Sequence, residues 1–62
     1  MSELKSILIV KMSSIGDVVH SLPLVHALRE RFPSAFIGWV VDHRCKRVLE
    51  NNPLIDRLFV FE

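Results

Sequence analysis

Residues 7–23 read Ile-Leu-Ile-Val-Lys-Met-Ser-Ser-Ile-Gly-Asp-Val-Val-His-Ser-Leu-Pro, and this stretch decides the fold. Its first four residues form a continuous apolar run rich in β-branched side chains, which is typical of a central strand in a parallel sheet. Small and polar residues at 12–17 follow as a short loop, and helical spacing begins at Val18. A strand that passes through a short loop into a helix predicts an α/β fold.

Beyond Asp17, apolar residues recur at steps of three and four, which suits a helix packed on a sheet. This stripe comprises Val18, Leu22, Val25, Leu28 and Phe32. Pro23 interrupts it, and proline is tolerated in the first turn of a helix but not in its middle. We therefore expect a helical turn after Asp17, a kink, and a main helix with Ser21 as its N-cap that ends at Pro33.

The remaining sequence repeats the alternation of strand and helix. Residues 36–41 read as a second buried strand, residues 43–51 as a helix with Val48 and Leu49 inward, and residues 57–61 as a third strand. Strand, helix, strand, helix, strand at this spacing predicts a Rossmann-like βαβαβ unit with parallel strands and right-handed crossovers.

Length and composition set limits on this unit. A domain of 62 residues has a marginal core, and its one cysteine excludes an internal disulfide. We therefore expect residues 1–62 to be part of a larger domain, with an open sheet that favours association. The net charge of +1 and the lack of a basic arm argue against nucleic acid. Without a secretory signal or a membrane span, the expected location is cytoplasmic.

The first loop holds the candidate chemistry, because ligands of open α/β sheets bind beyond the carboxyl ends of the strands. Gly16 permits a tight turn or a close approach of the backbone to a ligand. Ser13 and Ser14 offer hydroxyls, and Asp17 offers a carboxylate that can accept a proton. The alternative is that Asp17 and the serines simply cap the helix. Asp42 ends the second strand at the same edge.

Two nucleotide-binding motifs are absent from this loop. Its single glycine does not make the G-x-G-x-x-G dinucleotide fingerprint, and the P-loop pattern G-x-x-x-x-G-K-[ST] is missing. A nucleotide-binding Rossmann module is therefore the weakest of the alternatives.

The motif at residues 7–23 resembles the opening of the lipopolysaccharide heptosyltransferase family, glycosyltransferase family 9. Members of this family typically show Lys-x-Ser-Ser-x-Gly-Asp-Val-x-His-Thr-Leu-Pro after the first strand, and Ser21 stands here in place of the threonine. Residues 52–56, Asn-Pro-Leu-Ile-Asp, and residues 39–42, Trp-Val-Val-Asp, are similar to two further family elements. The resemblance covers nearly the whole chain.

The resemblance implies a two-domain GT-B-type enzyme, in which residues 1–62 are a partial amino-terminal, acceptor-binding domain and the donor-binding domain is absent. It implies inverting, metal-independent transfer of heptose from ADP-heptose to a lipid A-core acceptor, with no cofactor. Asp17 matches the general base of the family. The neighbouring substrate-binding positions carried by the motif are Lys11, Ser13, Ser14, Gly16 and His20. The 62 residues alone are expected to be inactive.

Several side chains keep two interpretations. Lys11 either orients Asp17, or meets an acidic acceptor, or is a solvated strand end. His20, one helical turn beyond Asp17, either serves the site or is a packed or capping histidine. The basic residues among 43–47 form either a solvated helix face or a contact with anionic lipid at the inner membrane. Trp39 and Cys45 are expected in the core.

A non-catalytic role is the rival from another class. In that interpretation the chain is a small α/β module stabilised by self-association or by a partner chain.

Overall fold

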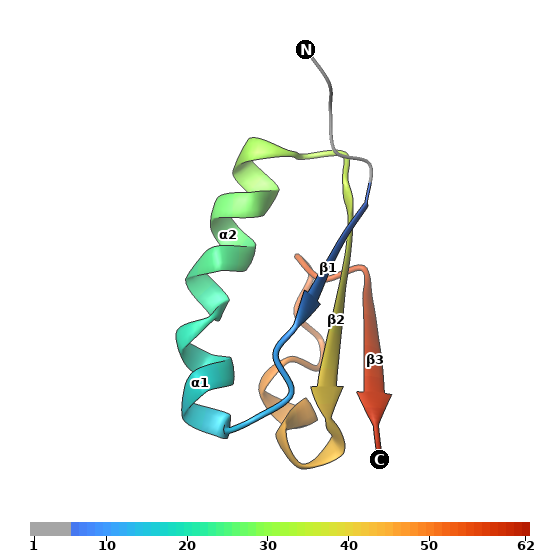
Figure 1. The fold of residues 1–62 in the computed structure, drawn as a ribbon. Helices are drawn as coiled ribbons and strands as arrows, with labels where there is room; N and C mark the ends of the chain where they lie inside the picture. Colours follow the sequence, from blue (N-terminus) through green and yellow to red (C-terminus); the bar gives the residue numbers. More distant parts are fainter. Residues whose placement is uncertain (1–5) are drawn as a thin grey trace.

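The computed structural model describes residues 6–62. Three strands and three helical segments alternate along the chain (Figure 1). They are β1 (Ser6–Val10), α1 (Ile15–His20), α2 (Leu22–Arg31), β2 (Phe36–Asp42), the 3-10 helix η1 (His43–Val48) and β3 (Arg57–Phe61). The expected alternation of strands and helices is confirmed.

The strands form one parallel sheet in the order β1-β2-β3. Ser6 pairs with Phe36 at the start of β1, and Gly38 pairs with Arg57 at the start of β3. Each strand is therefore joined to its neighbour by a crossover connection that contains a helix. The α/β class and the parallel sheet are those expected from the sequence.

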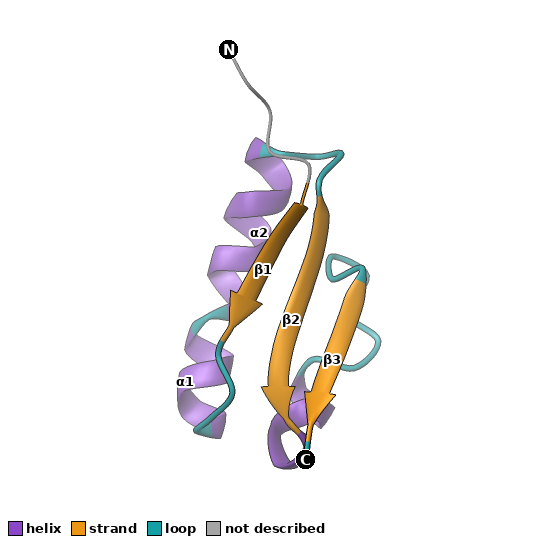
Figure 2. Cartoon of the chain, turned by 45° about the vertical axis from the view of Figure 1, so that its right-hand side comes forward, coloured by secondary structure: helices purple, strands orange, loops and turns teal. Residues whose placement is uncertain are grey.

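The helical segments gather on one face of this sheet, and the core lies between (Figure 2). Ile9, Ile37, Trp39 and Val41 project from the strands. They meet Val18 and Val25 of α1 and α2, and Cys45 and Leu49 of the η1 segment. The expected core positions of Trp39 and Cys45 are confirmed.

The opposite face of the sheet is uncovered within residues 6–62. Its exposed side chains include Leu8, Val10, Phe36, Phe59 and Phe61. Gly38 lies at the centre of this face, where a Cβ would stand 3.0 Å from Cε2 of Phe59 and 3.3 Å from Cδ1 of Leu8. The expectation of an open sheet with apolar surface is confirmed, and self-association through it stays a prediction.

Ser21 separates the two α-helices as expected, and Pro23 lies in the first turn of α2. Ser21 is the N-cap residue of α2, as expected, but its side chain makes no capping hydrogen bond. Its hydroxyl instead donates to the carbonyl of Asp17 at 2.9 Å. Ser21 itself has helical torsion angles, which turn its side chain back onto α1.

The helix expected over residues 43–51 is a 3-10 helix that ends at Val48. Asp42 begins it by accepting the backbone N–H of Arg44 at 2.9 Å. Cys45 and Val48, three residues apart, fall on one side of such a helix and both contact the core. Asn51 then takes a positive φ of 65°, which prevents the segment from continuing as a helix.

An arginine and an aspartate tie the amino-terminal edge of the sheet together. Arg29 of α2 donates to the carbonyls of Ala35 at 2.7 Å and Leu54 at 2.8 Å. It also pairs with Asp56 at 2.9 Å, and Asp56 accepts the backbone N–H of Ile37 at 2.7 Å. These bonds connect α2, β2 and the segment before β3, and we call Arg29 and Asp56 the amino-edge clamp.

Candidate functional site

The candidate site lies at the carboxyl edge of the sheet, where β1 and β2 end (Figure 1). The chain leaves β1 at Val10 and reaches the start of α1 at Ile15. Two backbone bonds hold the first part of this loop to β2: Lys11 donates to Val40 at 3.3 Å, and Asp42 donates to Met12 at 3.0 Å. We call residues 11–17 the motif loop.

Asp17 stands in the first turn of α1 and is exposed. Ser14 is the N-cap residue, but its side chain makes no capping bond. The side chain of Asp17 likewise forms no hydrogen bond or ion pair with any residue of the described 6–62 range. Ser14 thus holds the N-cap position without a side-chain capping bond within residues 6–62, and the Asp17 carboxylate in the first turn is exposed.

The other small residues of the motif loop are also exposed. The hydroxyls of Ser13 and Ser14 face solvent, and the peptide bond between the two residues is cis. Gly16 lies within α1 without a positive φ, so the tight-turn interpretation of this glycine is wrong. A Cβ at Gly16 would meet nothing within 4 Å, so the space beside it is open to a ligand.

Lys11 and His20 flank Asp17 in sequence, and both are exposed. No ion pair among residues 6–62 joins Lys11 to Asp17, so the structure does not support a role for Lys11 in orienting that carboxylate. His20 closes α1 and is not packed in the core, so the interpretation as a packed histidine is wrong. A substrate contact by either residue stays a prediction.

A second acidic residue at this edge is already engaged. Both carboxylate oxygens of Asp42 accept from the Arg44 guanidinium, at 3.1 and 3.0 Å. These bonds, together with the Arg44 backbone N–H, lower the pKa of Asp42 to about 2 from its ordinary value of 3.8. Asp42 is thus a paired anion, and its short spacing from Arg44 was the only sequence signal for this partner.

Basic residues of the segment that follows β2 lie beside acidic residues of the same chain. Arg44 and His43 lie beside Asp42, and Lys46 lies 4.0 Å from Glu50. Much of the positive charge is therefore balanced by acids of the chain itself. This arrangement favours the solvated face over a lipid-binding patch.

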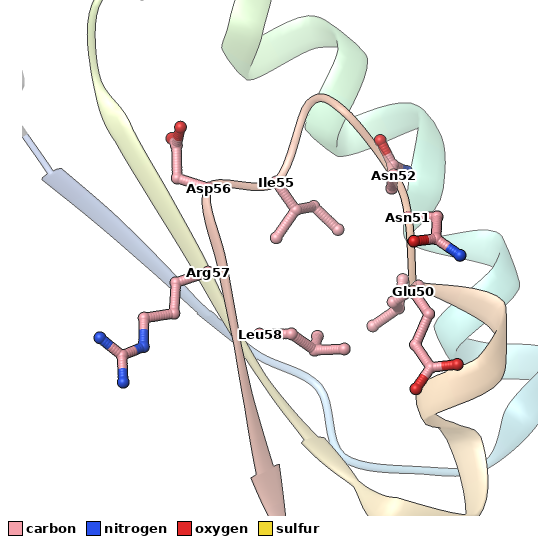
Figure 3. Close-up of a pocket in the computed structure, with 8 residues that line it drawn as sticks. Glu50, Asn51, Asn52, Ile55, Asp56, Arg57 and Leu58 are labelled. Atoms are coloured by element: carbon pink, nitrogen blue, oxygen red, sulfur yellow. The ribbon is translucent and has the colours of Figure 1, made fainter.

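A hollow of about 420 Å³ lies elsewhere, between residues 49–52, which follow η1, and residues 55–58 at the start of β3 (Figure 3). Ile55 and Leu58 point into it, whereas Arg57 points away. None of the motif-loop residues lines this hollow. It is separate from the candidate site.

Metal ligands and membrane spans were also sought in the described chain. Residues 6–62 contain no group of three His, Cys, Asp or Glu side chains placed to hold a metal ion. None of the helices in this range combines the length and apolar character needed to cross a bilayer.

This chain resembles known proteins in both sequence and fold. The fold superposes on the crystal structure of a family 9 glycosyl transferase from Veillonella parvula with a TM-score of 0.87 and 34% identity, over 94% of this chain. Lipopolysaccharide heptosyltransferase 1 of Campylobacter coli is 32% identical over 53 residues, which is 86% of this chain. In both sequence and fold, this chain is therefore similar to glycosyltransferases of family 9 over most of its length. No family model matches the chain.

The chain spans about a sixth of these relatives, 16% of the Campylobacter protein and 17% of the Veillonella chain. The resemblance stated from the motifs is thereby confirmed. The roles of the individual motif-loop residues stay predictions, because neither comparison identifies site residues.

Proposed function

We propose that the protein containing this chain is an inverting glycosyltransferase that moves heptose from ADP-heptose to the inner core of lipopolysaccharide, with Asp17 as general base. The observation that carries the proposal is the Asp17 carboxylate, exposed in the first turn of α1 and unpartnered within residues 6–62. A base must reach the proton it removes, and a carboxylate already bonded to arginine, such as Asp42, is less suited to this role.

The reaction needs one proton transfer and one displacement. The acceptor hydroxyl gives its proton to Asp17 as its oxygen forms a bond to the anomeric carbon of the donor. The bond from that carbon to the diphosphate breaks, and ADP leaves with the electron pair. Attack from the face opposite the diphosphate inverts the anomeric centre. We propose no metal ion and no cofactor for this step.

The remaining motif-loop residues are proposed to hold substrate around Asp17. Ser13 and Ser14 present hydroxyls, and Gly16 leaves open space beside the backbone. The ammonium group of Lys11 and the ring of His20, both exposed, are proposed to meet an anionic acceptor. We place residues 1–62 in the acceptor-binding, amino-terminal domain of a GT-B enzyme.

The proposed location is the cytoplasm, with peripheral contact at the inner membrane where a lipid-linked acceptor resides. Sedimentation with vesicles that contain anionic lipid tests this contact. Binding that is lost at high salt supports it, and no binding to vesicles with or without acceptor contradicts it.

The decisive experiment compares the full-length protein with its Asp17→Asn variant, using ADP-heptose and a lipid A acceptor that carries the first inner-core sugar. Loss of a general base lowers the rate by at least about a hundredfold. Glu30→Gln serves as the control, because Glu30 is an exposed acid on α2 outside the motif loop. Near-normal transfer by Asp17→Asn would place the base elsewhere. Inactive wild-type protein would mean that the substrate class is wrong.

A further inference from the structure

Trp39 occupies the centre of β2 and is fully buried. Its indole Nε1–H donates to the carbonyl of Lys11 at 3.0 Å, across 28 residues of sequence. A buried indole N–H is usually satisfied by a partner, so the bond alone has an ordinary structural explanation. Because the acceptor is the first residue of the motif loop, this bond also bears on how that loop is positioned.

The backbone ladder between β1 and β2 changes at this carbonyl. In a regular parallel ladder a residue donates to one neighbour and accepts from the residue two positions further along the partner strand. Lys11 donates to Val40, so regular pairing would have Lys11 accept from Asp42. The N–H of Asp42 instead bonds to Met12, one residue further along.

This one-residue slip removes the Lys11 carbonyl from the ladder. A carbonyl that leaves the ladder loses a hydrogen bond worth about 0.5–1.5 kcal/mol, and at this part-buried position another donor compensates for that loss. The Trp39 indole is that donor. The slip occurs where the chain departs from the sheet, and it sets the direction in which Ser13, Ser14 and the start of α1 leave the strand.

We infer that Trp39 is a positioning residue, whose indole N–H fixes the departure of the motif loop and thereby the place of Asp17. The inference rests on the proposed function only for its effect on catalysis. The anchoring of the loop is a property of the fold and can be measured without any substrate.

The test replaces Trp39 in the full-length protein by benzothienylalanine, in which sulfur takes the place of the indole N–H and the shape is retained. Trp39→Phe is the second variant. The control is Ile37→Val, which removes a methylene from a fully buried side chain on the same strand, away from the loop. Amide hydrogen exchange at Lys11 and Asp42 is measured in each variant, together with melting temperature, kcat and KM.

Loss of one neutral hydrogen bond predicts about threefold to tenfold faster exchange at these two amides with benzothienylalanine, and no such change in Ile37→Val. We expect kcat to fall by a similar factor while the melting temperature stays at or above that of the control. Exchange rates equal to those of the control would overturn the anchor itself. Faster exchange with unchanged kcat would overturn the positioning role. Faster exchange in a protein whose wild type shows no transfer would support the anchor and reject only the proposed reaction.

Discussion

The amino-edge clamp and the motif loop, at opposite ends of the sheet, treat their polar side chains in opposite ways. At the amino edge, Arg29 and Asp56 are joined to each other and to backbone groups of three segments. At the carboxyl edge, Asp17 and the motif-loop serines have no side-chain partner among residues 6–62. Bonded groups stabilise a fold, and unbonded ones at a ligand edge are available for chemistry. We therefore assign a structural role to the amino-edge clamp and propose a functional role for the motif loop.

The strongest test of this difference is the same Asp→Asn substitution at each end of the sheet. The larger effect on transfer is expected at Asp17. Asp17→Asn is expected to lose at least about a hundredfold in transfer with little change in melting temperature. Asp56→Asn is expected to keep kcat and to lose about 1–2 kcal/mol of stability, a modest value because its carboxylate is 41% exposed. Thermal melting and product formation are measured on both. Matching losses of stability in the two variants would erase the distinction.

Arg29→Ala is expected to show the largest loss of stability, about 3 kcal/mol, because the carbonyls of Ala35 and Leu54 lose their donor along with Asp56. Arg31→Ala is the matched control on α2, since Arg31 is exposed and only lies over the Phe32 ring at 5.4 Å. Denaturant unfolding followed by circular dichroism measures both. The combined Arg29→Ala and Asp56→Asn variant should lose less than the sum of the two single changes. Equal losses for Arg29 and Arg31 would mean that the clamp contributes nothing.

Lowering the pH should reduce the stability that Asp56 contributes at the amino edge of the sheet. The Ile37 backbone N–H and the Arg29 guanidinium hold the pKa of Asp56 below its ordinary value. A lowered folded-state pKa contributes stability that is present above the unfolded value and lost as the pH falls through the folded value. The difference in melting temperature between wild type and Asp56→Asn should therefore shrink from about pH 6 to about pH 3. A constant difference across this range would contradict the assignment.

Gly16→Ala carries the smallest expected effect on the fold. Alanine favours a helix over glycine, and a Cβ here meets nothing within 4 Å, so stability should rise by up to about 1 kcal/mol. Transfer should fall, because the methyl group occupies space proposed for substrate. Ala27→Gly, the reverse exchange at an exposed position of α2, is expected to lower stability and leave transfer unchanged. A Gly16→Ala protein with normal kcat and KM would remove this glycine from the site.

The sequence predicted the elements whose signals are local. Short apolar runs marked the strands, and Pro23 and Pro33 marked the break before α2 and its end. The 3-10 form of η1 was missed, because apolar residues at 45, 48 and 49 fit an α-helix as well as a tighter one. The spacing of those residues does not predict the side-chain cap by Asp42 or the positive φ of Asn51.

Long-range bonds escaped prediction for the same reason. The Arg29 pair with Asp56 spans 27 residues, and the Trp39 bond to Lys11 spans 28. Both depend on the register of the assembled sheet, which no local pattern contains. In the candidate site, the sequence placed Asp17 at the carboxyl edge of the sheet, as found, but only the structure distinguished its exposed carboxylate from the paired Asp42.

The parallel order of the strands also bears on how the chain is made. Ser6 pairs with Phe36, so 30 residues of synthesis separate the two partners. At about 5–20 residues per second, β1 waits roughly 1.5–6 s on the ribosome for β2. During that interval the apolar side chains of β1 lack their β2 neighbours, and a chaperone that binds short apolar segments would have access to them. The strand that later supports the motif loop is thus left without its neighbouring strand during synthesis.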